Sequence, residues 1–229
     1  MKSFGVIGVG RWGPNIIGSL NQIDKVHVSH VCDTNEDNLS IISKKFPLIK
    51  FVNHPSELFN LTELDALIIS TPVITHLDLV DAALNAGKHV FVEKPFGLCV
   101  KYCETLCQTA KKLNLHLMVG HVFLFNNAIL ELKQIISSGE LGRILHIGAQ
   151  RTNLGPVRKD VNAAWDLTSH DLSIFDFLLD ELPHRVSCIG SRNLDNHIAD
   201  TTYTSFVYPT GLIAHAHASW LNPRKVRQI

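Results

Sequence analysis

The first 120 residues alternate short apolar runs with longer amphipathic segments, and this alternation restricts the fold more than any other feature of the chain. The run 64–70 (LDALIIS) is apolar almost without a break, which is typical of a strand buried on both faces. The segment 75–86 that follows reads as a helix, and Gly87 marks its end. Strands that alternate with helices predict a parallel sheet covered by helices on both faces.

The same signals divide the chain into two expected domains, 1–122 and 123–229. In the first domain, strands are expected at 3–9, 26–32, 64–70, 90–92 and 116–119, with helices at 13–21, 35–46, 75–86 and 100–114. In the second domain, longer strands are expected at 143–152, 186–193, 201–207 and 212–220, with helices at 128–137 and 168–180. The turn YPTG (208–211) is expected to join the last two strands as a hairpin. The second domain therefore reads as an α+β domain with a mostly antiparallel sheet.

A glycine-rich loop follows the first expected strand and opens the first expected helix. Gly8, Gly10 and Gly13 have the spacing G-x-G-x-x-G, and Arg11 and Trp12 lie between the last two. In this context the spacing predicts a doubly wound Rossmann domain with a dinucleotide pyrophosphate at the helix N-terminus. The alternative is a glycine turn without a ligand.

Asp33 ends the second expected strand, 20 positions beyond Gly13. A carboxylate there accepts hydrogen bonds from the ribose hydroxyls of NAD and would repel the 2′-phosphate of NADP. No arginine follows Asp33 directly, so NAD rather than NADP is predicted. The alternative for Asp33 is an ordinary surface aspartate.

Two further loops follow neighbouring strands of the first domain. Thr71 and Pro72 follow one strand, and Glu93, Lys94 and Pro95 follow the next. Ligands of open parallel sheets bind beyond the carboxyl ends of the strands, so both loops are expected near the cofactor. Lys94 could hold a substrate hydroxyl and favour its ionised form. A surface salt bridge between Glu93 and Lys94 is the alternative.

Four motifs together resemble the Gfo/Idh/MocA family of NAD(P)-dependent sugar oxidoreductases: GVIGVGRWGPN, STPVITH, VEKPF and WDLTSHDLSI. The resemblance implies that Lys94, Asp166 and His170 are catalytic. It also implies that Thr71, Pro72, His76 and Glu93 line the cofactor, together with the residues of the glycine loop. From the residues alone, Asp166 and His170 stand four apart and are expected on one helical face, where His170 could act as general base or acid. The alternative there is an N-capping Asp166 or Thr168 beside an incidental histidine.

Within the family the chain looks most similar to the branch that acts on nucleotide-linked sugars. The resemblance implies oxidation of the 3-hydroxyl of a UDP-linked amino sugar, or of its uronic acid, in the synthesis of cell-surface polysaccharide. Arg151, Asn153 and Arg158 are then candidates for holding a carboxylate or a diphosphate. The alternatives are an inositol or free-sugar dehydrogenase, a keto-sugar reductase, or a non-catalytic NAD-binding protein.

The composition argues against binding to nucleic acid, to a membrane or to a metal ion. Lys and Arg together number 21, as do Asp and Glu, so no net charge favours nucleic acid or an acidic membrane. No apolar run is long enough to span a bilayer, and the five cysteines show no CxxC pair, so a reduced, cytoplasmic protein is expected. No metal is expected. Cys99, Cys103 and Cys107 are predicted to form a half-buried apolar stripe on a helix, and His215 and His217 share one strand face.

Members of the family are usually longer than this chain. The second domain is therefore expected to lack its C-terminal part, with PRKVRQI (223–229) as the start of a further strand. A homo-oligomer is expected to form through the sheet of the second domain if that sheet is complete.

Overall fold

The computed structural model describes residues 1–194 and 197–229, and the chain divides into two compact units, Met1–Gly120 and His121–Ile229. Each unit has its own sheet and its own hydrophobic clusters. The predicted fold class, a Rossmann sheet followed by an α+β domain, is confirmed.

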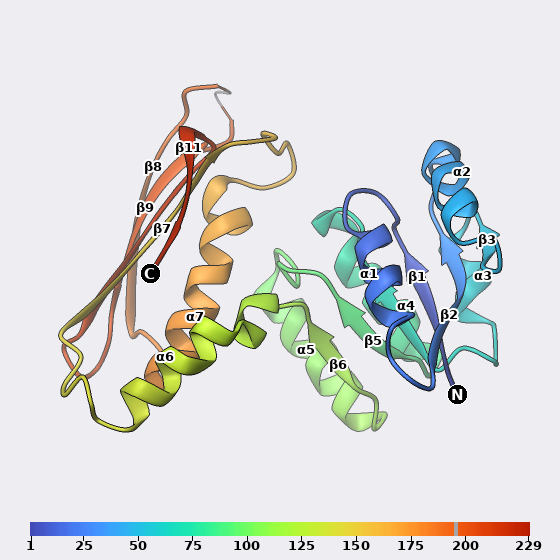
Figure 1. Ribbon diagram of the computed structural model, residues 1–229, viewed down its shortest axis with the longest axis horizontal. Helices are drawn as coiled ribbons and strands as arrows, with labels where there is room; N and C mark the ends of the chain where they lie inside the picture. The colour runs from blue at the N-terminus through green and yellow to red at the C-terminus, as the bar shows by residue number, and fades with distance from the viewer. Residues whose placement is uncertain (195–196) are drawn as a thin grey trace. The chain divides into compact units, whose positions relative to one another are not determined.

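The first unit is built on a six-stranded sheet in which all neighbouring strands are parallel (Figure 1). Its strands are β1 (Lys2–Ile7), β2 (Val26–Cys32), β3 (Lys50–Val52), β4 (Ala66–Ile69), β5 (His89–Val92) and β6 (Leu117–Val119). They lie in the order β3-β2-β1-β4-β5-β6. The order reverses between β1 and β4, so the carboxyl ends of these two strands form the point where such sheets bind ligands.

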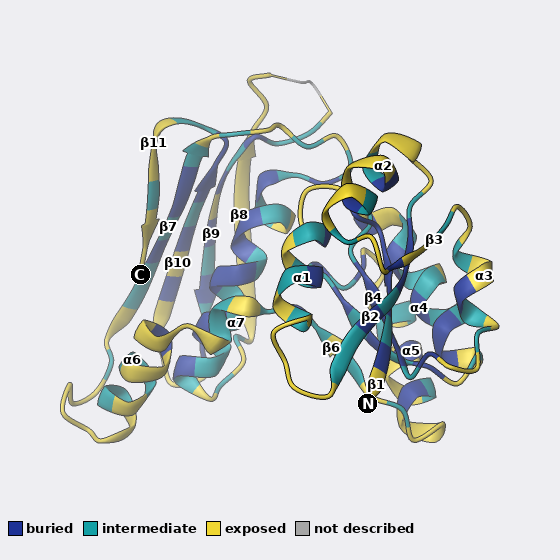
Figure 2. Cartoon of the chain, turned by 45° about the vertical axis from the view of Figure 1, so that its right-hand side comes forward, coloured by how far each residue is buried: buried dark blue, intermediate teal, exposed yellow. Residues whose placement is uncertain are grey.

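Helices cover both faces of this sheet. They are α1 (Gly13–Leu20), α2 (Glu36–Lys45), α3 (Pro55–Phe59), α4 (His76–Asn85) and α5 (Val100–Lys112), with a 3-10 turn η1 (Val73–Thr75) before α4. Successive strand residues point to opposite faces, so Val6 packs towards α1 and α2, and Ile7 packs towards α4 and α5. Both are buried, as are β1 and β4 along most of their length (Figure 2).

Two elements of the first unit were not predicted. β3 has three residues, of which none is fully buried, and α3 has five. Elements of this length show too few residues for either period to emerge from the sequence. α2 begins as expected, because the Asn35 side chain accepts hydrogen bonds from the amides of Asp37 and Asn38.

The predicted apolar stripe of cysteines on α5 is wrong. Cys99 and Cys107 are exposed and Cys103 is half-buried, while Leu106 and Ala110 are the buried residues of the helix. The four-residue spacing placed the thiols on one face but could not tell which face meets the sheet. Within the described ranges, no group of three or more histidine, cysteine or acidic side chains could hold a metal ion.

The second unit contains a five-stranded sheet with the order β11-β7-β10-β9-β8. Its strands are β7 (His146–Leu154), β8 (Arg185–Ser191), β9 (Thr201–Val207), β10 (Ile213–Ser219) and β11 (Leu221–Gln228). All pairs are antiparallel except β7 with β10. The predicted hairpin joins β9 and β10, and Gly211 adopts a φ of +84° in its turn.

The strand expected from Pro223 is present as β11, which begins two residues earlier, at Leu221. It pairs with β7 from Leu221 to Gln228, with a shift of register between Leu221 and Val226. The irregularity follows Asn222 and Pro223, which break the alternation that a strand prediction needs.

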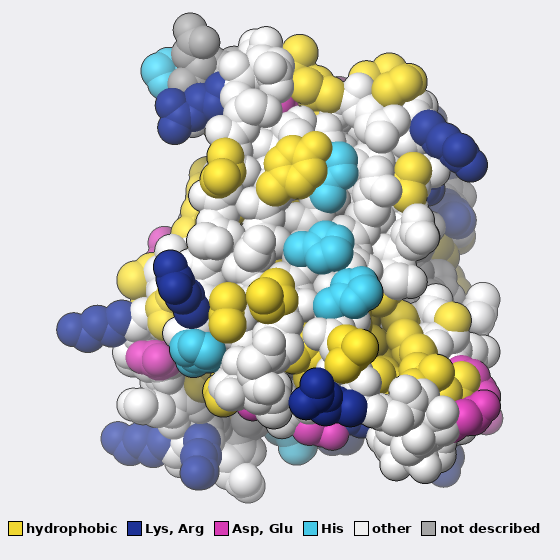
Figure 3. All heavy atoms as spheres, turned by 90° about the vertical axis from the view of Figure 1, so that its left-hand side faces the viewer, with side chains coloured by type: hydrophobic (Ala, Val, Ile, Leu, Met, Phe, Trp, Pro, Cys, Tyr) yellow, Lys and Arg dark blue, Asp and Glu magenta, His cyan; other side chains and the backbone are white. Residues whose placement is uncertain are grey.

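Two helices, α6 (Asn127–Ser137) and α7 (Ser169–Leu179), belong to the second unit, and α7 packs against one face of the sheet. The small residues Ala214 and Ala216 of β10 let Phe175 of α7 approach closely, and the Phe175 ring meets Phe206 edge to face. No described helix covers the other face of the sheet. It carries histidine and apolar side chains, among them His215, His217 and Tyr203 (Figure 3).

Candidate active site

The three glycines of the loop after β1 each occupy a position that the chain geometry restricts differently. Gly8 has a φ of +89°, and a Cβ there would lie 2.7 Å from the carbonyl oxygen of Ser70. A Cβ on Gly13 would lie 2.8 Å from the oxygen of Gly8, so α1 can approach β1 only with glycine at this position. A Cβ on Gly10 would meet nothing within 4 Å. The open space at Gly10 fits the close approach of a dinucleotide pyrophosphate to the backbone.

Asp33 orders the glycine loop from the end of β2. One carboxylate oxygen accepts from the amide of Val9 at 2.8 Å and from the side-chain amide of Asn38 at 3.2 Å. The other oxygen accepts from the amide of Asn35 at 2.8 Å. A carboxylate offers about four acceptor positions, so capacity for a ribose hydroxyl remains. The ribose role of Asp33 stays a prediction.

The loop after β4 meets the glycine loop at the carboxyl edge of the sheet, where the loop after β5 also begins. A Cβ on Gly8 would also lie 2.8 Å from Cγ2 of Thr71, so these two loops touch. The Thr71 hydroxyl lies 2.7 Å from that of Thr75. Arg11, Trp12 and Pro72 are exposed on the neighbouring surface.

Glu93 and Lys94 follow β5 directly. The amide of Glu93 bonds to the oxygen of Ile69 at 2.9 Å, which continues the pairing of β4 with β5. Burial raises the pKa of Glu93, and the amide and charge of Lys94 oppose that shift. The amide of Lys94 donates to the Glu93 carboxylate at 3.3 Å, and the Lys94–Pro95 bond is cis. Glu93 and Lys94 are both half-buried, so this pair is not a fully solvated surface bridge.

His76 is buried at the start of α4. Its Nδ1 lies 2.9 Å from the oxygen of Pro95, and its Nε2 lies 2.9 Å from the oxygen of Thr71. The ring thus lies between the loops after β4 and β5. The expected lining of the cofactor by His76 stays a prediction, and the described contacts place its ring against the protein backbone.

The segment around Asp166 and His170 contains a helix of unexpected type. A π-helical turn, η3 (Ala164–Thr168), precedes α7, so Asp166 and His170 are not in one regular α-helix. π-helical turns occur often at functional sites. A four-residue spacing cannot reveal one, because the extra residue per turn depends on tertiary packing.

Asp166 and His170 contact different neighbours. One oxygen of Asp166 accepts from the indole Nε1 of Trp220 at 3.1 Å, and the other lies 3.6 Å from a guanidinium nitrogen of Arg158. The His170 ring meets Phe123 edge to face, with 4.8 Å between the centroids. Arg158 itself forms a two-point ion pair with Asp160.

Arg151 is placed differently from the expectation that it binds substrate. It is 4% exposed, and its guanidinium lies 4.3 Å above the ring of Phe123 while it pairs with Asp171. Arg151 therefore ties β7 to α7 inside the second unit. Burial raises the pKa of Asp171, and Arg151 opposes this shift. The sequence signal for Asp171 was only its position next to His170.

Arg227 is a cation near this cluster that was not predicted. Its guanidinium donates to the oxygen of Thr152 at 2.9 Å and to the side-chain oxygen of Asn153 at 2.6 Å. Burial and the neighbouring Arg151 lower the pKa of Arg227, while Asp171 and Asp166 raise it.

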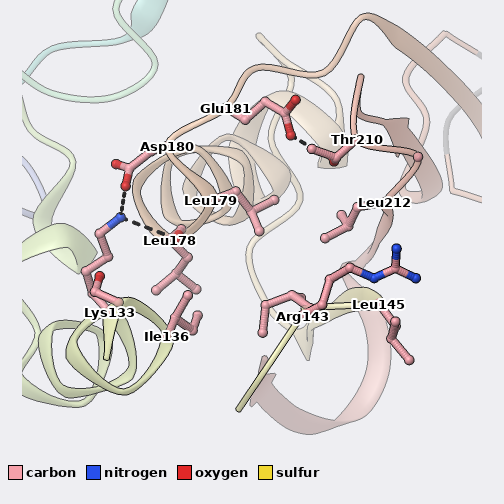
Figure 4. A pocket seen from close by; sticks show the side chains of 13 residues that line it. Lys133, Ile136, Arg143, Leu145, Leu178, Leu179, Asp180, Glu181, Thr210 and Leu212 are labelled. Carbon is pink, nitrogen blue, oxygen red and sulfur yellow. Dashed lines mark hydrogen bonds and ion pairs between the residues drawn. The ribbon is translucent and has the colours of Figure 1, made fainter. Parts of the chain in front are cut away.

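A separate pocket of about 370 Å³ lies at the other end of α7 from His170 (Figure 4). Leu178, Leu179 and Leu212 line it, and an ion pair between Lys133 and Asp180 closes one side. None of the predicted site residues lines this pocket.

Comparison with known proteins agrees with both units. The model of an oxidoreductase family with an NAD-binding Rossmann fold matches residues 2–121, and that of the Gfo/Idh/MocA C-terminal domain matches residues 129–228. The chain belongs to the Gfo/Idh/MocA oxidoreductase family. The first unit is its NAD-binding Rossmann domain, as predicted. The match over 129–228 gives no support to the expected loss of part of the second domain.

Two curated Gfo/Idh/MocA relatives differ in substrate. Myo-inositol 2-dehydrogenase of Thermotoga maritima is 29% identical over 199 residues, which cover 85% of this chain and 60% of that protein. UDP-N-acetylglucosamine 3-dehydrogenase of Acidithiobacillus ferrooxidans is 27% identical over 216 residues, which cover 94% of this chain and 66% of that protein. The chain thus spans about 60% of the length of the first of these relatives.

Solved structures show the same fold. Scyllo-inositol dehydrogenase of Lactobacillus casei, with bound NAD(H) and scyllo-inositol, matches with a TM-score of 0.86 at 20% identity, over 96% of this chain and 69% of that one. GenD2 from gentamicin A biosynthesis, in complex with NAD, matches with a TM-score of 0.92 at 19% identity, over 97% and 67%. Among the described residues, no helix is long and apolar enough to cross a membrane.

Proposed function

We propose that this chain binds NAD and oxidises a hydroxyl of a sugar or polyol. The observation that carries the proposal is that three loops follow strands at the same carboxyl edge of the first sheet, with the middle loop in contact with the first and joined to the third by His76. These are the glycine loop, the loop with Thr71 and the loop with Lys94. Gly10 leaves open space there, and Asp33 accepts a hydrogen bond from the Val9 amide of the glycine loop.

In the proposed reaction, the cofactor takes the hydride and protein side chains take the proton. When bound, NAD accepts the hydride from the carbon that carries the hydroxyl. His170 is the proposed acceptor of the hydroxyl proton, and Lys94 the proposed donor that stabilises the developing alkoxide. The products are a ketone, NADH and a proton. Asp166 supports the site through its contacts with Trp220 and Arg158.

A nucleotide-linked sugar is the substrate class that we propose within this reaction. Arg227 supports it, because within the described residues its guanidinium contacts only neutral oxygens and forms no ion pair within 4 Å. An exposed guanidinium whose described hydrogen-bond partners are all neutral oxygens can still pair with a bound diphosphate or carboxylate. Asn153 holds Arg227 in place, whereas Arg158 is already paired with Asp160. Synthesis of a cell-surface polysaccharide would be the corresponding role.

An uncharged polyol is the second candidate, since the myo-inositol 2-dehydrogenase relative is slightly more similar in sequence. Turnover with NAD on UDP-N-acetylglucosamine, on its uronic acid and on myo-inositol separates the two. Activity on myo-inositol alone would contradict the anionic substrate and leave the dehydrogenase proposal intact. Reduction of a keto-sugar by NADH tests the reverse direction.

Two variants test the catalytic roles. We expect Lys94→Ala and His170→Ala each to lower kcat by about 10²- to 10⁴-fold while NADH still binds. Lys101→Ala and His184→Ala, both at exposed positions, serve as matched controls. Near-normal turnover in both site variants would contradict the assignment. Binding of NADH without turnover of any sugar by the wild-type chain would favour a non-catalytic NAD-binding protein.

Cofactor choice is tested by calorimetric titration with NADH and with NADPH. We expect tighter binding of NADH, and we expect Asp33→Ser to reduce this preference because it removes the charge that repels a 2′-phosphate. Equal affinity of the wild-type chain for both cofactors would contradict the role of Asp33.

We also propose that two copies associate through the uncovered face of the second sheet. Ile189 is 78% exposed, Tyr203 59% and Ile213 52%, and all three belong to its strands. Apolar side chains gathered on one face are typical of protein–protein contacts.

A further inference from the structure

The His76 ring connects two loops that strand pairing no longer holds together. β4 and β5 are hydrogen-bonded neighbours, and their ladder ends where the amide of Glu93 bonds to Ile69. Beyond that point Thr71 and Pro95 lie on separate loops. His76 is 1% exposed and places one ring nitrogen 2.9 Å from the carbonyl oxygen of each.

Both partners of the ring can only accept hydrogen bonds. A neutral imidazole has one N–H and one lone pair, so it can donate to only one of the two carbonyls. The lone pair would then face the other carbonyl oxygen, and two buried acceptors would be left opposed. An imidazolium donates from both nitrogens and satisfies both oxygens. The geometry therefore favours the doubly protonated ring.

The next residue along α4 holds the same loop. A Cβ on Gly97 would overlap the side chain of Leu77, so the backbone after Pro95 lies directly on the first turn of α4. Leu77 supplies apolar packing, and His76 supplies the hydrogen bonds. The segment that carries Lys94 is thus docked on α4 at two adjacent positions.

We propose that His76 is a positioning residue, protonated on both ring nitrogens, that fixes the Lys94 loop against the Thr71 loop. The bonds from its two nitrogens set where the backbone of Pro95 lies, and hence where the adjacent Lys94 side chain starts. The consequence for turnover rests on the proposed function, but the protonation state and the position of Lys94 do not.

The first test measures the protonation of the two His76 ring nitrogens directly. In a long-range ¹H–¹⁵N correlation spectrum of the whole chain at neutral pH, we expect both nitrogens of His76 to carry protons. The signals are assigned by their loss in His76→Gln. A spectrum in which one ring nitrogen is unprotonated would overturn the proposal.

The second test reads the position of Lys94 without any substrate. A glutamine amide donates from a single nitrogen and lacks the two separate donor nitrogens of the ring, so we expect it to hold the Lys94 loop less firmly. Lys94 should then react faster with an amine-acylating reagent in His76→Gln. Peptide mapping by mass spectrometry gives the rate, with Lys88 and Lys101 in the same sample as internal references. The exposed His116→Gln is the matched control and is expected to leave the Lys94 rate unchanged. An unchanged Lys94 rate in a folded His76→Gln would overturn the proposal.

Turnover adds a third reading. With a substrate identified, we expect kcat of His76→Gln to fall by up to about 10²-fold, since small displacements of a reacting group have effects of that size. The KM for NAD is expected to change little. If the wild-type chain turns over no sugar, the proposed function fails, and the ring spectrum and the Lys94 rate still decide the role of His76. If His76→Gln does not fold, His76→Asn replaces it in the assignment and in the Lys94 measurement. The ring spectrum of the wild-type chain needs no folded variant to show how many ring nitrogens carry protons.

Discussion

Arg151 donates two hydrogen bonds to a single carboxylate oxygen of Asp171, from Nε at 2.9 Å and from Nη2 at 2.7 Å. Asp171 is 1% exposed, and its other oxygen has no hydrogen-bond partner in the described part of the chain. The pair joins β7 to α7 one residue from His170. Its removal should therefore be felt both in stability and at the site.

We expect Asp171→Asn to lower the free energy of unfolding by about 3–5 kcal/mol, because it leaves the Arg151 charge buried without its partner. Urea denaturation measures the change. The double variant Arg151→Met, Asp171→Leu should lose less than Asp171→Asn, since neither charge remains to be desolvated. A double variant that is less stable than Asp171→Asn would contradict this account.

A substitution at Gly10 can test cofactor binding without disturbing the folded structure. We expect Gly10→Ala to fold with unchanged stability, because its Cβ would meet no protein atom within 4 Å, and to bind NADH more weakly. Gly18→Ala is the matched control, since Gly18 also has open space but lies within α1. This control should gain about 0.5–1 kcal/mol of stability and keep its NADH affinity. Calorimetry that shows equal NADH affinity for Gly10→Ala and the wild type would place the cofactor elsewhere.

Asp176 on α7 predicts a pH dependence of stability. Burial raises its pKa to about 6, above the value in an unfolded chain. Between about pH 4 and pH 6 the folded state thus binds more protons than the unfolded state, so this group makes the free energy of unfolding fall as pH rises. Asp176→Asn should remove this fall and be more stable than the wild type at pH 7 by about 1 kcal/mol, after allowance for solvent screening.

Urea denaturation at pH 4 and at pH 7 measures the effect of Asp176→Asn. Glu131→Gln, at an exposed position of α6, serves as control and should behave as the wild type at both pH values. A difference between Asp176→Asn and the wild type that is the same at both pH values would show that Asp176 does not titrate as described.

The uncovered face of the second sheet predicts the behaviour of the chain in solution. We expect a dimer by light scattering after size exclusion, and a monomer for the double variant Ile189→Glu, Tyr203→Glu, because buried like charges oppose association. Leu48→Glu is the control, since Leu48 is also an exposed apolar residue, at 96%, but belongs to the first unit. A dimer that persists in the double variant would place the interface elsewhere.

Local signals in the sequence were sufficient for most of the fold and for the cofactor loop. β2 and β9 have the bounds expected from their alternation, and Asn35 caps α2 as expected. The need for glycine at position 13 follows from neighbours in the chain, because a strand that turns into a helix must bring Gly13 close to Gly8. The sequence therefore predicts an element well when its hydrophobic period extends over many residues, or when the deciding residues lie within one turn of each other.

Other features depend on which segments meet in space. Cys99, Cys103 and Cys107 were expected to form a half-buried stripe, but two of them are exposed, since periodicity gives a face of a helix and not the direction in which that face points. Arg151 was expected to reach a ligand, yet it turns inward to Asp171, 20 positions away. The bonds of Trp220 to Asp166 and of Arg227 to Asn153 likewise join residues far apart in the chain.

The sequence by itself determined the Rossmann class, the glycine loop and the identity of the candidate residues Asp33, Lys94 and His170. The tertiary structure decided the strand order that brings the loops after β1, β4 and β5 to one edge. It also placed the carbonyls of Thr71 and Pro95 on either side of the His76 ring, and it turned Arg151 inward to pair with Asp171. The physical reason is that propensity and periodicity act over a few neighbouring residues, whereas burial and hydrogen-bond satisfaction are settled only when distant segments pack together.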